Sequence, residues 1–276
     1  SHLHISAYPM PAEKIRQLAA HVRKLIILEE GYPFVERFVR GVLPQQVEIS
    51  GKEDGSVPPE GELTPDNIRP ALSLKAREAK VKTGFPLPGR PPQLCPGCPH
   101  ADTYDAIKKA LADFEQTMVT SDIGCYTLGA LPPYSAIEST VNMGASVGMA
   151  KGAAEAGFHP VVAVIGDSTF LHSGITPLID AVAHNANMTL IILDNETVGM
   201  TGGQPTMLPS SRLETVVTGV GVPKEHLRVI TAHRKYTEEN IRVIREEIDY
   251  RGLSVVIAVR ECVETAKRHK KERRSA

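Results

Sequence analysis

Apolar and polar residues follow one another in blocks that predict a strand, a helix and a second strand in the later half of the chain. An apolar run from Val161 to Ile165 ends at the turn Gly166-Asp167-Ser168. A helical pattern follows from Gly174 to His184, and a second apolar run covers Leu190 to Leu193. Such a unit has parallel strands joined by a right-handed crossover, so both strands end at the same edge of one sheet. Ligands usually bind at that edge in open α/β folds.

The polar residues at these two strand ends predict a site for Mg²⁺ and a diphosphate. Asp167 follows the first strand, and Asn195 follows the second. A carboxylate, a side-chain amide and a loop carbonyl are hard oxygen ligands, which Mg²⁺ binds together with phosphate oxygens. The backbone N–H groups of Ser168 and Thr169 are placed to receive a phosphate. The loop that follows Asn195 is rich in glycine, and its N–H groups can also surround a diphosphate.

Further apolar runs predict that this unit belongs to a larger sheet. The predicted strands are Thr117–Thr120, Leu227–Ile230 and Ser254–Val259, and the predicted helices are Ala101–Ala112 and Thr237–Tyr250. The expected fold class is α/β, a three-layer, doubly wound and mostly parallel sheet. Glycines repeat at helical spacing from Met143 to Ala153, which favours close packing against the sheet or a partner helix because glycine otherwise costs helix stability.

Residues 1–74 predict a smaller, partial α/β domain ahead of this sheet. Its expected strands are Leu3–Ser6 and Lys24–Leu28, and its expected helices are Pro11–Val22 and Pro33–Leu43. The first strand has no lead-in and no initiator Met precedes it, so we expect a fragment or a processed chain. Residues 75–94 are rich in Pro and Gly and predict a linker. Residues 95–262 form the main domain, and the basic tail 263–276 is expected to be solvated and disordered.

Composition narrows the classes of function. The net charge is -1, so no overall basic surface points to nucleic acid. No apolar run reaches the length of a membrane span, and no signal-peptide pattern is present. Four cysteines without a secretory signal are typical of a reducing compartment, and we expect a cytoplasmic protein.

The cysteines form a pair and two singles. Cys95 and Cys98 make a C-x2-C turn that enters a predicted helix, and alone this is a redox pair, half of a zinc site or two cluster ligands. Cys125 and Cys262 each follow a predicted strand, so all four thiols can meet where the loops converge. Zinc and unligated thiols remain the alternatives to a cluster.

Several motifs taken together resemble the alpha subunit of indolepyruvate ferredoxin oxidoreductase, within the thiamine diphosphate-dependent 2-oxoacid:ferredoxin oxidoreductases. The motifs are LCPGCPH, SDIGCYTLGALPP, MGASVGMAKG, GDSTFLHSG and GMTGGQP. The GDS turn followed by Asp194-Asn195 resembles the thiamine diphosphate motif, with Ser168 in place of the usual last glycine. The resemblance covers Leu94–Cys262 and, more loosely, Ser1–Leu74, which is similar to part of a transketolase-C-like domain.

The resemblance implies roles for individual residues. Asp167, the Asn195 side chain and the Thr197 backbone carbonyl would bind Mg²⁺. Cys95, Cys98, Cys125 and Cys262 would bind a 4Fe-4S cluster. The expected thiamine diphosphate contacts are Gly124, Cys125, Tyr126, Met143, Gly166, Asp167, Ser168, Thr169, Asn195, Thr197, Gly199, Met200 and Thr201. His100 and His172 are candidates for contact with the substrate, although a lone histidine is more often structural.

The activity implied is the oxidative decarboxylation of a 2-oxoacid, such as an aryl pyruvate, to an acyl-CoA. Electrons would leave through the cluster to ferredoxin, and CoA would take the acyl group. In this family a separate pyrimidine-binding domain carries the Glu that activates the cofactor, and the sequence contains no candidate for it. We therefore expect weak cofactor binding and poor turnover unless another chain supplies that domain, as a dimer or a heteromer with a second oxidoreductase subunit.

Two other functions remain open. A nonoxidative thiamine diphosphate-dependent decarboxylase subunit would use the same Mg²⁺ site without the cysteines. A catalytically silent module would keep the fold but lose Mg²⁺-dependent cofactor binding. A nicotinamide-binding domain is disfavoured because no G-x-G-x-x-G opens a helix after a strand.

Overall fold

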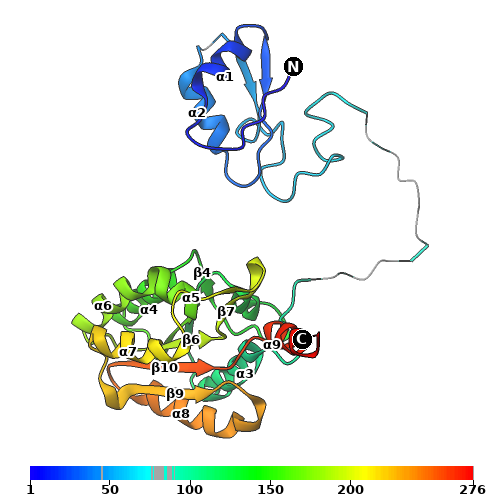
Figure 1. Ribbon diagram of the computed structural model, residues 1–276. Helices are drawn as coiled ribbons and strands as arrows, with labels where there is room; N and C mark the ends of the chain where they lie inside the picture. Colours follow the sequence, from blue (N-terminus) through cyan, green and yellow to red (C-terminus); the bar gives the residue numbers. More distant parts are fainter. Residues whose placement is uncertain (45, 76, 78–83, 86–88, 90, 276) are drawn as a thin grey trace. The chain divides into compact units, whose positions relative to one another are not determined.

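The computed structural model describes residues 1–44, 46–75, 77, 84–85, 89 and 91–275 (Figure 1). The chain divides into two compact units, Ser1–Pro88 and Gly89–Ala276. The division falls within residues 75–94, the predicted linker. Each unit has its own core and is described by itself.

The larger unit is built on a six-stranded sheet in which every neighbouring pair of strands is parallel. The strand order is β4-β3-β5-β6-β10-β9. The strands are β3 (Met118–Ser121), β4 (Ser139–Thr140), β5 (Val161–Gly166), β6 (Met188–Asp194), β9 (Leu227–Thr231) and β10 (Leu253–Val259). The three strands at the centre are almost entirely buried, which explains why they read as continuous apolar runs rather than as alternating ones.

Helices cover both faces of this sheet (Figure 1). The main helices are α3 (Pro99–Leu111), α4 (Ala145–Glu155), α6 (Ile175–Ala183), α7 (Ser210–Val220) and α8 (Thr237–Asp249). Successive residues of a strand point to opposite faces, so each strand contributes to two cores. Val162 and Val164 of β5 pack with α3 and α8, whereas Ala163 and Ile165 pack with α4, α6 and α7. The predicted three-layer α/β class is confirmed.

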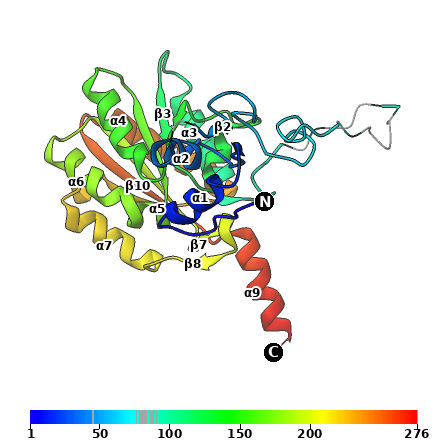
Figure 2. The same cartoon turned by 90° about the horizontal axis from the view of Figure 1, so that it is seen from above.

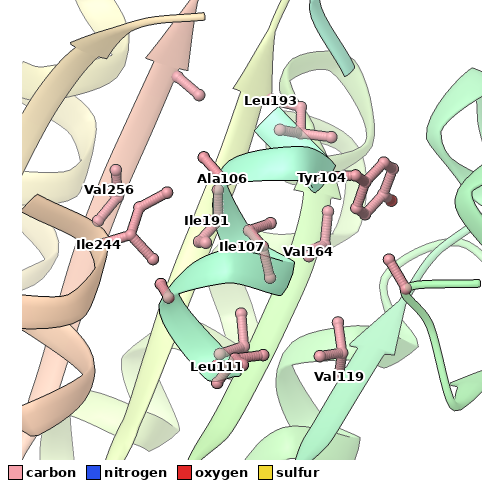
Figure 3. Packing of buried hydrophobic residues seen from close by; sticks show 14 of the residues in the cluster. Tyr104, Ala106, Ile107, Leu111, Val119, Val164, Ile191, Leu193, Ile244 and Val256 are labelled. Carbon is pink, nitrogen blue, oxygen red and sulfur yellow. The ribbon is translucent and has the colours of Figure 1, made fainter. Parts of the chain in front are cut away.

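Figure 3 shows the first of these cores, where α3 lies on the sheet. Ile107 of α3 and Ile244 of α8 are fully buried beside Val164, Ile191 and Val256 from three adjacent strands. Burying a Val or Ile side chain contributes about 1.5–3 kcal/mol each. This packing fixes the start of α3, and with it the C-x2-C turn, against the sheet.

The smaller unit contains two short parallel strands, β1 (Lys24–Ile26) and β2 (Glu48–Ser50), with helices α1 (Ala12–Ala19) and α2 (Phe34–Val42). No strand forms at Leu3–Ser6, so that prediction was wrong. Leu3 and Ile5 instead pack against the apolar core of this unit, which explains their alternating pattern without a strand partner.

The predicted disorder of the basic tail was also wrong, because the tail forms the helix α9 (Val263–Ser275), which extends from the larger unit (Figure 2). Its side chains from Lys267 to Arg273 are exposed, as expected for a solvated charge run. Arg268 Nη1 donates to the Gly202 carbonyl at 2.7 Å and ties the helix to the glycine-rich loop. Among the described residues, no helix has the length and apolarity needed to cross a membrane.

The glycines of α4 do not pack against the sheet, which was one of the two predicted alternatives. A Cβ at Gly148 or Gly152 would meet no atom within 4 Å, and both residues are exposed. Val147 and Ala150 face the core instead, so the glycines lie on the outer face of the helix.

Candidate functional site

One cavity lies at the carboxyl ends of β3, β5 and β6, the edge at which the sequence predicted a ligand. Its volume is about 200 Å³, several times the roughly 30 Å³ that a water occupies. All thirteen residues predicted as cofactor contacts line it, and so does His100. Ile123, Leu193 and Val198 line it as well, although the sequence analysis had not assigned them.

The predicted cluster ligands Cys95, Cys98 and Cys262 do not line the cavity, and neither does His172, a candidate for contact with the substrate. His172 lies on the helical turn Phe170–Gly174, where its side chain is exposed and outside the cavity lining. Proximity to the GDS turn in sequence therefore did not predict proximity to the cavity.

The Tyr126 ring explains why glycine occupies two positions around the cavity. A Cβ at Gly124 would lie 2.4 Å from the Tyr126 ring, and one at Gly166 would lie 2.5 Å from it. The φ of Gly124 is 176°, which is extended backbone open to any residue. Close approach to the ring, rather than backbone freedom, is thus what requires glycine. The Tyr126 hydroxyl donates to Thr169 Oγ1 at 3.0 Å, which holds the ring across the cavity wall.

The carboxylate of Asp167 is buried at the start of the turn after β5. It accepts hydrogen bonds from Ser168 N at 2.7 Å and from Glu196 N at 3.0 Å. Burial, together with the nearby charge of Asp194 and against the effect of the backbone donors, raises the pKa of Asp167 to about 7. A buried carboxylate with a raised pKa is stabilised in its charged form when a cation binds next to it.

Two buried oxygens beside Asp167 have no hydrogen-bond partner. They are Asp194 Oδ2 and Ser168 Oγ. Buried polar atoms are almost always satisfied, and unpaired ones point to an absent ion, water or ligand. A cation bound by oxygen ligands and carrying phosphate oxygens would satisfy both, so the residues present fit a Mg²⁺-diphosphate group.

Asn195 completes this cluster from the end of β6. Its Oδ1 accepts from Thr197 N at 3.2 Å, and its Nδ2 lies 3.1 Å from His100 Nε2. His100 is 3% exposed. Burial, together with the charge of Arg260, lowers the pKa of His100 to about 4, so the ring is neutral near pH 7.

The four cysteines are free thiols whose charges influence one another. The pKa of Cys98 is raised to about 11, chiefly by burial. The charges of Cys95 and Cys125 contribute to this rise, and the N–H groups of His100 and Ala101 oppose it. Burial also raises the pKa of Cys125, with contributions from Cys262 and Cys95. With raised pKa values, Cys98 and Cys125 are thiols near neutral pH, and a positive metal centre bound beside them would stabilise their thiolate forms.

The chain segment that carries Cys262 runs beside Asn195. Arg260 N donates to the Asp194 carbonyl at 3.0 Å, and Cys262 N donates to the Asn195 carbonyl at 3.1 Å. The Arg260 side chain donates to Asp102 at 2.7 Å and to the Gly97 carbonyl at 2.6 Å. The C-x2-C turn and the end of β10 are therefore joined at the edge of the cavity.

Within the described residues, no group of three or more His, Cys, Asp or Glu side chains is placed to hold a metal ion. The four cysteines predicted to bind a cluster are therefore not placed as such a group in this structure. The Mg²⁺ site expected from the sequence does not depend on one, because two of its three ligands are an amide oxygen and a backbone carbonyl.

Two acidic residues near the cavity were missed by the sequence analysis. Asp194 carries the unpaired oxygen, and its position directly before Asn195 at a buried strand end was the available signal. Asp122 is fully buried and accepts from Ser146 N at 2.8 Å and Ser146 Oγ at 2.7 Å. It holds the start of α4 against the end of β3, a role that only the tertiary structure reveals.

Comparison with known proteins agrees with this geometry. Residues 122–258 match the family "Thiamine pyrophosphate enzyme, C-terminal TPP binding domain". The indolepyruvate oxidoreductase subunit IorA of Archaeoglobus fulgidus is 36% identical over 278 residues, which cover 93% of this chain and 44% of that subunit. The 2-oxoacid:ferredoxin oxidoreductase 1 subunit beta of Aeropyrum pernix is 25% identical over 61% of this chain and 58% of its own length.

Among solved structures, the 2-oxoglutarate:ferredoxin oxidoreductase of Magnetococcus marinus has the same fold. The TM-score is 0.53 at 20% identity, over 67% of this chain and 66% of that one. This chain therefore spans less than half the length of the IorA subunit that it matches, and about two thirds of the solved chain.

Proposed function

We propose that this chain is the cofactor- and cation-binding portion of a 2-oxoacid:ferredoxin oxidoreductase. Residues 122–258 match the thiamine pyrophosphate enzyme domain, and 93% of the chain is similar to part of indolepyruvate oxidoreductase subunit IorA. The observation that carries the proposal is the cavity itself, because Asp167, Asn195 and Cys125 line the same space. The oxygen groups suited to bind a cation and its diphosphate therefore share one cavity with the thiol of Cys125.

We propose Mg²⁺ as the cation. Asp167 and Asn195 would bind it through side-chain oxygens and Thr197 through its backbone carbonyl. The unpaired oxygen of Asp194 supports this assignment, since a second carboxylate near the ion adds negative charge where the ion binds. Bound thiamine diphosphate supplies the decarboxylation chemistry, while these residues hold its diphosphate in place.

Cys125 favours an oxidative reaction over a nonoxidative one. Its thiol lines the cavity, and its pKa responds to the charges of Cys262 and Cys95. A 4Fe-4S cluster bound by these residues and Cys98 would therefore lie beside the cofactor, as required for electrons to leave the site one at a time. A nonoxidative decarboxylase has no use for this arrangement.

The substrate and the partners are proposed from the relatives. The name of IorA suggests indolepyruvate as the 2-oxoacid. We propose CoA as acceptor of the acyl group and ferredoxin as acceptor of the electrons. Because the relatives are named as subunits, we propose a heteromer in the cytoplasm. A pyrimidine-binding domain, in the same protein or in another chain, would supply the activating Glu, and without it we expect little turnover.

The test is the iron content of the chain purified without oxygen. We expect about four irons and as many sulfides per chain, as a 4Fe-4S cluster requires, together with visible absorbance of an iron–sulfur centre. A Cys95→Ser, Cys98→Ser double variant should lose both the iron and the colour while keeping Mg²⁺-dependent thiamine diphosphate binding.

Two outcomes would contradict the proposal in different ways. Colourless wild-type protein that still binds thiamine diphosphate with Mg²⁺ would indicate a nonoxidative thiamine enzyme. Protein that binds neither iron nor the cofactor would indicate a silent module that keeps only the fold.

A further inference from the structure

The contact between His100 and Asn195 joins the C-x2-C turn to the proposed Mg²⁺ site. His100 is the second residue of α3, two positions after Cys98, and Asn195 directly follows β6. The ring nitrogen and the amide nitrogen lie 3.1 Å apart, and both side chains are buried. A buried contact between two nitrogens is favourable only if one donates a proton and the other accepts it.

The backbone of Thr197 determines which one donates. A backbone N–H can only donate, and that of Thr197 lies 3.2 Å from Asn195 Oδ1. The oxygen of the amide must therefore face Thr197, and its NH₂ group must face His100. An amide NH₂ group has no lone pair to offer, so His100 Nε2 accepts and the proton of the neutral ring is on Nδ1.

The His100 ring is held in this orientation from other sides. It meets the Tyr126 ring edge to face, with the centroids 5.9 Å apart. Its own backbone N–H faces Cys98, whose position is set by the turn from Cys95. Because Ala106 and Ile107 anchor α3 in the core, the backbone that carries the ring has a fixed position.

We infer that His100 is a positioning residue that fixes the amide of Asn195, so that its oxygen rather than its nitrogen is presented to the cation. This inference rests on the proposed function and adds to it a residue that acts through Asn195 rather than by binding the cation. Without the acceptor at His100, only the Thr197 N–H opposes a flip of the amide, and a flipped amide would turn its N–H donors toward a cation. Partners of this kind typically change metal affinity by about 10- to 100-fold.

The first test reads the ring directly in the wild-type protein. With ¹⁵N-labelled histidine and assignment through the α3 backbone, the His100 ring should show the neutral Nδ1–H form at pH 7. An Nε2–H ring or a charged ring would overturn the inference, because Nε2 would then be a donor. This measurement needs no variant and no bound cofactor.

The second test is a double-mutant cycle on cation affinity. Free Mn²⁺ would be followed by its EPR signal in the presence of thiamine diphosphate, because Mn²⁺ takes the same oxygen ligands as Mg²⁺. We expect His100→Leu to weaken Mn²⁺ binding by roughly 10-fold, and His100→Gln, which keeps an acceptor, to recover most of it.

The Asn195→Asp background separates positioning from packing. A carboxylate has two equivalent oxygens and no N–H group, so no flip needs to be prevented. We expect His100→Leu to cause no further loss there. An equal loss in both backgrounds would overturn the inference and leave His100 a packing residue. Wild-type protein that binds no Mn²⁺ with the cofactor would instead contradict the proposed function, and the ring measurement would still decide the contact.

Discussion

Asp167 decides how the cation-free protein responds to pH. Its pKa is raised from 3.8 to about 7 by burial, so the folded protein keeps a proton that the unfolded chain has released between these values. The free energy of unfolding should therefore fall as the pH rises through that window, by a few kcal/mol at most. Asp167→Asn should flatten this fall, which thermal unfolding in EDTA at several pH values would measure.

Asp167→Asn should remove the pH-dependent loss of stability, but it should weaken ligand binding. An amide cannot supply the negative charge that a divalent cation needs, so Asp167→Asn should abolish Mg²⁺-dependent thiamine diphosphate binding. Glu155 is an exposed residue on the outer face of α4. Glu155→Gln is the matched control and should change neither the pH dependence of stability nor cofactor binding. An unchanged pH profile in Asp167→Asn would show that another group causes the fall.

Gly166 should tolerate no side chain. A Cβ there would lie 2.5 Å from the Tyr126 ring, and the ring has a hydrogen bond that resists its displacement. We expect Gly166→Ala to cost about 1–3 kcal/mol of unfolding free energy. In a Tyr126→Ala background the space is free, so the same substitution should cost much less. Equal costs in both backgrounds, measured by urea unfolding, would contradict this explanation.

At the level of single residues, the sequence located the cavity well because its residues follow strand ends. Strand ends of a parallel sheet meet at one edge, so the sequence alone predicts that Asp167 and Asn195 lie close together. His172 was misplaced since the direction of a helical turn decides whether a side chain faces the cavity. The pairing of Asn195 with His100 could not be predicted, because it joins residues 95 positions apart through a side-chain contact.

Among the elements, α4 offers the most direct test of exposure. Gly148 and Gly152 lie on its outer face with open space beside them. Replacing glycine by alanine there should stabilise the chain by up to about 1 kcal/mol for each substitution. Gly144→Ala is the matched control and should destabilise, because Gly144 has a φ of 91° and a Cβ there would lie 2.4 Å from Ser173 Oγ. Destabilisation by Gly152→Ala would show that another surface covers this face.

The elements that were predicted correctly are those with a buried face. The apolar runs of β5 and β6 and the periodic pattern of α8 reflect packing that the sequence itself records. The two wrong predictions concern segments with little burial. Leu3–Ser6 has a strand-like alternation but no neighbouring strand, and the charged tail forms α9 because its residues are good helix formers even without an apolar face.

For the whole molecule, the fold class followed from the order of the elements, since strands alternating with helices form a parallel sheet. The order of the elements does not reveal the catalytic residues in the same way. The residues that line the cavity all belong to the larger unit. The sequence offers no candidate for the Glu that the resemblance implies for activation, so we propose that another domain or chain supplies it.

The larger unit should fold and bind ligands by itself. Its two cores contain only residues after Gly89, and so do the cavity and all four cysteines. We therefore expect a chain of residues 89–276 to unfold in one cooperative transition, at the temperature of the corresponding transition in the full chain. It should also keep the Mg²⁺-dependent affinity for thiamine diphosphate of the full chain. Calorimetry would measure the unfolding temperature and the cofactor affinity, with residues 1–75 alone as the control for the smaller unit. A marked loss of stability or affinity in residues 89–276 would show that the first unit supports the site, and the proposed ligand set would then need a contribution from residues before Gly89.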